Sequence, residues 1–230
     1  MAENSGVFFG RTLVQQRGSM GGSRHVFVKL QGVKNELVFP TFGGQLQNPF
    51  GGVAKIFAGD LFEVRLDDAG VNPKVYLLKT FKVKSATGTT VVVERDGYKH
   101  IPFVGDNLMV APEEIGGAGT SAKIVAVKAT ADTWELTMDA TLGATEGEIL
   151  VEADAEGTML VKAINAVAPC DYDCWYAPAV VGDADDFDNA RYFIAPVLGG
   201  LMYTKKMSPM PACVLKLNKC NINGWFKVAL

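Results

Sequence analysis

The sequence has few of the residues from which catalytic and metal sites are usually built. Among 230 residues there are two histidines, His25 and His100, and four cysteines. Each histidine is expected to be a surface or packing residue, so a His-based catalytic triad lacks its base. We expect small, buried, reduced thiols, with a disulfide or a four-cysteine metal site as the alternatives. The cysteines form two pairs whose spacings, four and seven residues, are not typical of a zinc finger: Cys170 with Cys174, and Cys213 with Cys220.

Motifs of common enzyme classes are also missing. The sequence contains neither a Gly-x-Ser-x-Gly nucleophile elbow nor a Gly-Lys-Ser/Thr phosphate-binding loop. The acidic run Asp183–Asn189 could offer oxygen ligands to calcium. An EF-hand loop, however, needs Gly at its sixth position and Glu at its twelfth, where this run has Asp188 and Ile194. We therefore predict that the protein is not an enzyme and has no catalytic residues, no metal site and no cofactor.

Long hydrophobic runs are absent. The longest apolar stretch, Tyr192–Tyr203, is interrupted by Pro196, Gly199 and Gly200 and is too short to cross a bilayer. The N-terminal residues lack the basic and apolar regions of a secretory signal, so the sequence predicts neither a signal peptide nor a membrane partner. The mean hydropathy of +0.14 is nevertheless high. This surplus of apolar residues indicates surface that other protein chains cover.

Charged residues are distributed in blocks along the chain. Residues 1–59 have six Lys or Arg and two Asp or Glu, and residues 60–130 have nine of each. Residues 131–190 have fourteen acids and one lysine, and residues 191–230 have six bases and no acid. Basic ends suit termini that reach neighbouring copies, and they equally suit termini that fold back onto the acidic segment. The net charge of −3 and the lack of a basic stripe interleaved with aromatics predict no nucleic-acid partner.

Short runs rich in Val, Phe and Thr, separated by turn signals, occur along much of the chain. In Phe81–Ser85 apolar residues alternate with lysines, which predicts a half-buried strand with its lysines in water. The best short-helix candidate is Ala184–Tyr192, with Asp183 as its N-cap. The fold class is predicted as mainly β, with a small β-barrel or sandwich as its core. The predicted strands are Val26–Leu30, Glu36–Phe39, Leu61–Leu66, Val75–Ser85, Thr89–Glu94, Leu108–Val110, Lys123–Lys128, Thr133–Met138 and Glu148–Glu152.

One pattern occurs twice in this core. Gly59–Val64 resembles Gly105–Val110, which lies 46 residues later. Two copies are too few for a solenoid. Because Gly and Asp both suit turns, we interpret the pattern as a Gly-Asp turn that opens a strand twice in one barrel.

The regions outside the core differ in composition. We predict an N-terminal arm and hairpin region (1–56), the β-barrel core (57–155), and an extended, irregular C-terminal segment rich in aromatics and prolines (156–230), packed on the core or on a neighbour. A disordered terminus is the alternative for residues 1–23. The residues predicted to bind a partner are Phe8, Phe9 and Arg11 in the arm and Trp225, Phe226 and Lys227 in the tail.

Three stretches carry a resemblance to a known family. They are Ala54–Leu61 at the entry to the core, Val104–Pro112 inside it, and Arg191–Leu198 near the C-terminus. In these stretches the sequence resembles auxiliary (head decoration) capsid proteins of tailed bacteriophages, particularly those of crAss-like phages. None of the three stretches is a catalytic signature.

The resemblance implies a non-enzymatic virion protein, assembled in the host bacterial cytoplasm, that decorates and stabilises the phage head. Its expected partners are the major capsid protein and neighbouring auxiliary or head-fibre subunits, and a homo-oligomer is allowed. A head-fibre role is an alternative within phages. A carbohydrate- or receptor-binding module, using Trp175, Tyr176 and Trp225, is another. An enzyme with a site made of scattered carboxylates is the third.

Overall fold

The computed structural model describes the central part of the chain most fully. The described residues are 44–46, 48, 55–65, 74–96, 99–168, 171–173, 193–194, 200–203, 207–216, 221–222 and 226–229. The predicted strands Val26–Leu30 and Glu36–Phe39 and the predicted helix Ala184–Tyr192 lie outside these ranges. Within them the fold is mainly β, as predicted. The described residues contain one short helix, α2 (Ala212–Lys216), which the sequence analysis did not predict.

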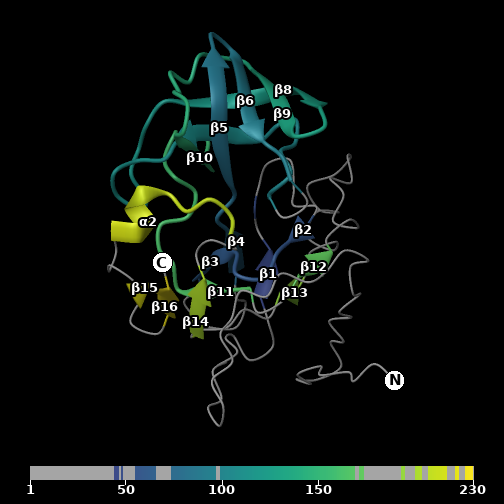
Figure 1. The fold of residues 1–230 in the computed structure, drawn as a ribbon. Coiled ribbons are helices and arrows are strands. Elements are labelled where there is room, and N and C mark those ends of the chain that lie inside the picture. Colours follow the sequence, from purple (N-terminus) through teal and green to yellow (C-terminus); the bar gives the residue numbers. More distant parts are fainter. Residues whose placement is uncertain are drawn as a thin grey trace.

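Six antiparallel strands form a closed barrel at one end of the molecule (Figure 1). Around the barrel the order is β10-β5-β6-β9-β8-β7, so the first and last strands of the segment pair with each other and close it. A barrel is one of the two cores that the sequence predicted. The strands are β5 (Thr80–Thr87), β6 (Thr90–Glu94), β7 (Asn107–Val110), β8 (Ser121–Ala129), β9 (Thr133–Met138) and β10 (Ile149–Glu152).

Alternating apolar side chains fill the barrel. In β5, Phe81 and Val83 are buried while Lys82 and Lys84 are exposed, as the alternation predicted. The two longest strands each carry a register shift, between Val83 and Ser85 in β5 and between Ile124 and Ala126 in β8. Such irregularities bend a strand and increase its twist, which helps a small sheet to close on itself. The interior is completed by Val91, Val93, Leu108, Ala122, Ile124, Leu136, Met138 and Leu150.

A second, five-stranded sheet lies next to the barrel, in the order β11-β3-β4-β1-β13. Its strands are β1 (Gly44–Leu46), β3 (Leu61–Arg65), β4 (Lys74–Leu77), β11 (Ala166–Val167) and β13 (Phe193–Ile194). Two smaller sheets pair β2 (Lys55–Ile56) with β12 (Tyr172–Asp173), and β14 (Gly200–Tyr203) and β15 (Asn221–Ile222) with β16 (Phe226–Ala229). Residues 156–230 thus contribute short strands and α2 within the described ranges.

The single strand predicted over Val75–Ser85 is wrong, because the chain there forms two strands in two different sheets. β4 ends at Leu77 and β5 begins at Thr80, and the two residues between them cross from the sheet to the barrel. Leu78 still donates its backbone N–H to the Leu61 carbonyl. Lys79, the next residue, has a side chain that is buried between the two layers.

An apolar cluster joins the barrel, the sheet and the helix. Met109 and Val151 contribute to it from the barrel, Leu61 from the sheet, and Cys213 and Val214 from α2. Cys213 is a free, buried thiol, as expected for the cysteines. The other three cysteines lie outside the described ranges. No helix among the described residues is long and apolar enough to span a membrane.

Candidate functional site

Two copies of one turn organise the junction between the sheet and the barrel. In Phe57–Asp60 and Phe103–Asp106 the aspartate N–H donates to the phenylalanine carbonyl, at 2.9 and 3.1 Å. In return the phenylalanine N–H donates to the aspartate Oδ2, at 2.7 and 2.9 Å. Gly59 and Gly105 have φ of 89° and 99°, a region that glycine adopts without the steric cost of a Cβ.

The repeated Gly-Asp turn predicted from the sequence is therefore present, with one difference. The second copy opens the barrel strand β7, but the first opens β3 of the five-stranded sheet rather than a barrel strand. Both aspartates are buried, at 1% exposure for Asp60 and none for Asp106. The two aspartates differ in the side chain that binds each of them across the junction.

Asp106 forms a buried ion pair with Lys79. The Nζ of Lys79 lies 2.6 Å from Oδ2 of Asp106, and the two side chains are 2% and 0% exposed. The ring of Phe103 lies 5.7 Å from the same Nζ, within the range of a cation–π contact. A buried pair of this kind has lost its hydration, so its stability depends on the closeness of the two groups and on further hydrogen bonds.

Asp60 binds a histidine instead of a lysine. Oδ2 of Asp60 lies 3.0 Å from Nε2 of His100, and Oδ1 accepts a hydrogen bond from Ser208 Oγ at 2.6 Å. Nδ1 of His100 accepts the backbone N–H of Thr80 at 2.9 Å. Because Nδ1 is an acceptor, the ring proton is placed on Nε2, which donates to Asp60. His100 is thus a packing residue, one of the two roles expected for it.

A third carboxylate lies near Lys79. Glu152, at the end of β10, is 2% exposed and its Oε2 accepts a 2.6 Å hydrogen bond from Nδ2 of Asn48. Asn48 also bonds both backbone groups of Leu77, at 2.8 and 2.9 Å. In the barrel register Val151 is opposite Thr80 and Glu152 is opposite Leu108. This register brings Glu152 beside the segment that carries Lys79 and the strand that follows Asp106.

The electrostatics of this cluster are those of charges held in a dry core. Burial lowers the pKa of Lys79, but the charges of Asp106 and Glu152 outweigh that effect and raise it overall. Burial raises the pKa of the Asp106 carboxyl, and the opposing effects of Lys79 and of the Phe103 N–H do not cancel the rise. Burial alone therefore favours the uncharged form of both partners, while their mutual attraction favours the charged forms.

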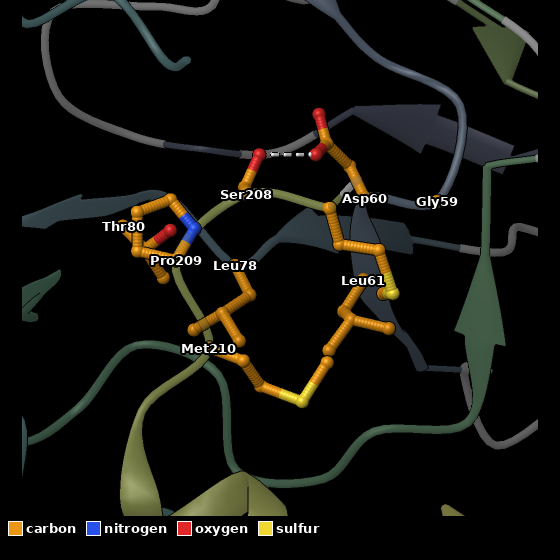
Figure 2. A pocket seen from close by; sticks show the side chains of 9 residues that line it. Gly59, Asp60, Leu61, Leu78, Thr80, Ser208, Pro209 and Met210 are labelled. Atoms are coloured by element: carbon orange, nitrogen blue, oxygen red, sulfur yellow. Dashed lines mark hydrogen bonds between the residues drawn. The ribbon is translucent and has the colours of Figure 1, made fainter. Parts of the chain in front are cut away.

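A small cavity is lined in part by Thr80. Its volume is about 10 Å³, which is space for one water molecule. Figure 2 shows that Leu61, Leu78 and Met210 point toward one another in it, with Ser208 bonded to Asp60 at its edge. The hydroxyl Oγ1 of Thr80 is buried without a hydrogen-bond partner among the described residues. The cavity suits a buried water and is too small for an organic substrate.

The partner-binding residues predicted from the sequence are only partly described. Phe8, Phe9, Arg11 and Trp225 lie outside the described ranges, as does the acidic run Asp183–Asn189. Phe226 and Lys227 lie on β16, where they are in register with Gly200 and Leu201 of β14 in a parallel pair. Within the described part of the chain, no group of three or more His, Cys, Asp or Glu side chains could hold a metal ion.

Lys79, Asp106 and Glu152 were not predicted from the sequence to form a group. Two signals were available for them. Lys79 is the single charge within the run Val75–Phe81, whose other residues are apolar except for Thr80, and such a setting is unusual for a lysine in water. Asp106 belongs to the repeated turn, whose first copy contains Asp60. No protein-family model, no curated protein and no solved structure was found to match this chain.

Proposed function

We propose that the protein is a non-enzymatic component of a bacteriophage head that binds major capsid subunits and stabilises the shell. The proposal rests first on the resemblance of Ala54–Leu61, Val104–Pro112 and Arg191–Leu198 to auxiliary capsid proteins. In this proposal the barrel is the rigid body, and the arm and the tail attach it to its neighbours.

The observation that carries the proposal is that the protein's own side chains occupy its interior. The barrel is filled by its own side chains. Across the junction Lys79 pairs with Asp106, and His100 pairs with Asp60. The cavity beside Thr80, of about 10 Å³, has room for about one water molecule. A molecule built in this way presents its outer surface to partners, which suits a role in an assembly.

Part of that outer surface is apolar where the barrel meets the junction. Val104 is 60% exposed and Val125 is 50% exposed. The two positions are close along the backbone, because Gly105 donates its N–H to the Ile124 carbonyl at 2.8 Å. Single exposed valines are ordinary on soluble proteins. This pair is a convenient site for a test, since substitutions there leave the core untouched.

The test is addition of the purified protein to phage shells that lack it. We expect attachment at a fixed ratio to capsid protein, with cryo-electron microscopy placing the barrel outside or between capsid subunits. Removal of residues 1–23, which include Phe8, Phe9 and Arg11, should lower the occupancy. The double variant Val104→Lys with Val125→Lys reports whether this barrel surface also contributes.

Other outcomes would favour the other functions. Failure of the full chain to attach to shells under any condition would overturn the decoration role. Saturable binding of a glycan by the isolated protein would instead support a carbohydrate- or receptor-binding module. Density confined to fibres that project from the shell would support a head-fibre subunit.

A further inference from the structure

Lys79 and Asp106 are buried and in direct contact, and the strand register places Glu152 next to the segments that carry them. We propose that Lys79 and Asp106 react to form an intramolecular amide bond between Nζ and Cγ, with Glu152 moving the protons. The bond would join the junction before β5 to the turn before β7. This proposal is independent of the proposed function, because it concerns only chemistry inside one chain.

The reacting groups are already in contact. Nζ of Lys79 lies 2.6 Å from Oδ2 of Asp106, so the carboxyl carbon is one C–O bond beyond a hydrogen-bonded oxygen. When two reacting groups reach a near-attack orientation within one molecule, the effective concentration of one toward the other can be as high as about 10⁵–10⁸ M. The two side chains are 2% and 0% exposed, so bulk water does not compete for either of them.

Both partners are fixed by the backbone around them. Oδ2 of Asp106 also accepts the Phe103 N–H at 2.9 Å, and the Gly105 turn fixes the aspartate backbone. Oδ1 of Asp106 has no hydrogen-bond partner among the described residues, so one carboxyl oxygen is not held in place. Lys79 is followed by Thr80, whose N–H is bound to His100, and it is preceded by Leu78, whose N–H is bound to Leu61.

The reaction requires a neutral amine and a protonated carboxyl. Transfer of one proton from Nζ to Oδ2 along their hydrogen bond produces both, and it does not change the net charge of the pair. Burial raises the pKa of Asp106 and by itself lowers that of Lys79, which favours the transfer, whereas the charges of Asp106 and Glu152 raise the pKa of Lys79 overall and oppose it. Amine and acid then face each other with no solvent between them.

The bond changes balance without an oxidant or a reductant. The Nζ lone pair attacks Cγ of the protonated carboxyl, the Nζ–Cγ bond forms and one Cγ–O bond breaks. The departing oxygen keeps its own proton and receives one of the two amine protons, so that water leaves and the amide keeps the other proton. Glu152 is the group that accepts this proton from nitrogen and returns it to oxygen, a step of general acid–base catalysis.

Glu152 is placed for that role by two elements. The register of β10 sets it opposite Leu108, two residues after Asp106, and next to Val151, which is opposite Thr80. Asn48 holds one of its oxygens at 2.6 Å. Its charge also acts on Lys79. A carboxylate in the same position could serve ion pairing alone, and the test below separates the two roles.

The chain also contains a solvent-exposed lysine–aspartate pair that serves as a control for the buried one. Lys84 and Asp132 have Nζ and Oδ2 3.0 Å apart, but their side chains are 41% and 74% exposed. Water surrounds both groups there, and each can leave the contact at little cost. The proposal therefore predicts that Lys79 and Asp106 react and that Lys84 and Asp132 do not.

The decisive measurement is the intact mass of the folded full-length protein, taken after denaturation. We expect a mass lower than that of the sequence by one water molecule, and a proteolytic digest in which the Lys79 peptide is joined to the Asp106 peptide. The variants Lys79→Arg and Asp106→Ala should have their full masses, and Lys84→Arg should keep the deficit. Asp106→Asn should lose one ammonia molecule instead of one water, because the leaving group is then the amide nitrogen.

The role of Glu152 is tested by the rate. In Glu152→Gln both reacting groups remain, and we expect the deficit to develop at least about 10²-fold more slowly than in the unaltered protein. If the unaltered protein still has the mass expected from its sequence after prolonged incubation, with no water lost, the proposal is overturned. A water loss located within a single peptide, for example at Asp96-Gly97, rather than between two peptides would also overturn it. Cross-linking of Glu152→Gln at the original rate would remove Glu152 from the mechanism.

Discussion

Asp60 and Asp106 occupy the same position in two copies of one turn, but the first binds a neutral histidine and the second a lysine. Oδ2 of each aspartate accepts the N–H of the phenylalanine three residues earlier. His100 and Lys79 then approach these same oxygens, at 3.0 and 2.6 Å. The turn therefore supplies a pre-oriented buried carboxylate, and the partner decides which chemistry it has.

Replacement of His100 should destabilise the fold. His100→Ala leaves the Thr80 N–H without the ring nitrogen that accepts it, and it removes one hydrogen bond from Oδ2 of Asp60, which still accepts the Phe57 N–H. We expect the buried Thr80 N–H alone to cost about 1–3 kcal/mol, measured by urea unfolding of the full chain. His100→Asn should lose less, because its amide oxygen can accept the Thr80 N–H. If the two variants lost the same free energy of unfolding, the hydrogen bond from the Thr80 N–H to His100 would not contribute to stability.

The two glycines of the repeated turn should tolerate alanine poorly. Gly105 has a φ of 99°, well beyond the left-handed helical region near 58° that Gly88 occupies. An alanine at Gly88 would meet no atom within 4 Å and should cost about 1–2 kcal/mol from its backbone conformation alone. We expect Gly105→Ala to lower the free energy of unfolding by more than Gly88→Ala. The opposite order would show that the turn relaxes without loss.

Glu94 should contribute stability that is lost in acid. Burial raises the pKa of Glu94, but hydrogen bonds and charges from Lys99 and Lys82 outweigh it and lower the pKa below 4.5. A carboxylate with a lowered pKa stabilises the folded state above its unfolded pKa, and this stabilisation disappears as the pH falls through the folded value. Glu94→Gln should therefore remove part of the acid dependence of the free energy of unfolding. An unchanged acid dependence in Glu94→Gln would contradict the prediction.

Cys213 should be unreactive in the folded protein. It is 3% exposed, and burial raises the pKa of its thiol. Since the thiolate is the nucleophile, both effects slow alkylation. We expect peptide mapping after iodoacetamide treatment to find Cys213 unmodified in the native state and fully modified in urea. Rapid native labelling would show that α2 detaches from the apolar cluster.

Most strands of the barrel could be predicted from the sequence, because β5 with β6, β7 with β8 and β8 with β9 are consecutive antiparallel pairs, and side chains in β5 and β6 alternate between core and solvent. The five-stranded sheet could not be predicted in the same way. In this sheet β3 pairs with β11, β4 pairs in parallel with β1, and β1 pairs with β13, so these partners are not consecutive in the sequence. Val75–Ser85 therefore looked like one strand, because alternation and apolar content do not show where a chain passes from one sheet to another.

The buried charges could be predicted even less. Lys79 and Asp106 are 27 residues apart, and nothing in the sequence around either residue identifies the other as its partner. Only the closure of the barrel brings them together with Glu152. The repeated Gly-Asp pattern did predict the local turn, since that geometry depends on adjacent residues alone. What each aspartate binds depends on contacts between distant segments.

The order of the strands has a consequence for how the molecule is assembled from parts. β1, β3 and β4 of the sheet precede the whole barrel in the chain, and β11 and β13 follow it. The barrel begins at Thr80 and ends at Glu152, and Thr80 is in register with Val151, so the chain enters and leaves it at neighbouring points. The barrel is an inserted module whose two ends meet. Because the two ends of the insertion are adjacent, a different module could be inserted at the same point of the sheet without changing the order of the sheet's own strands.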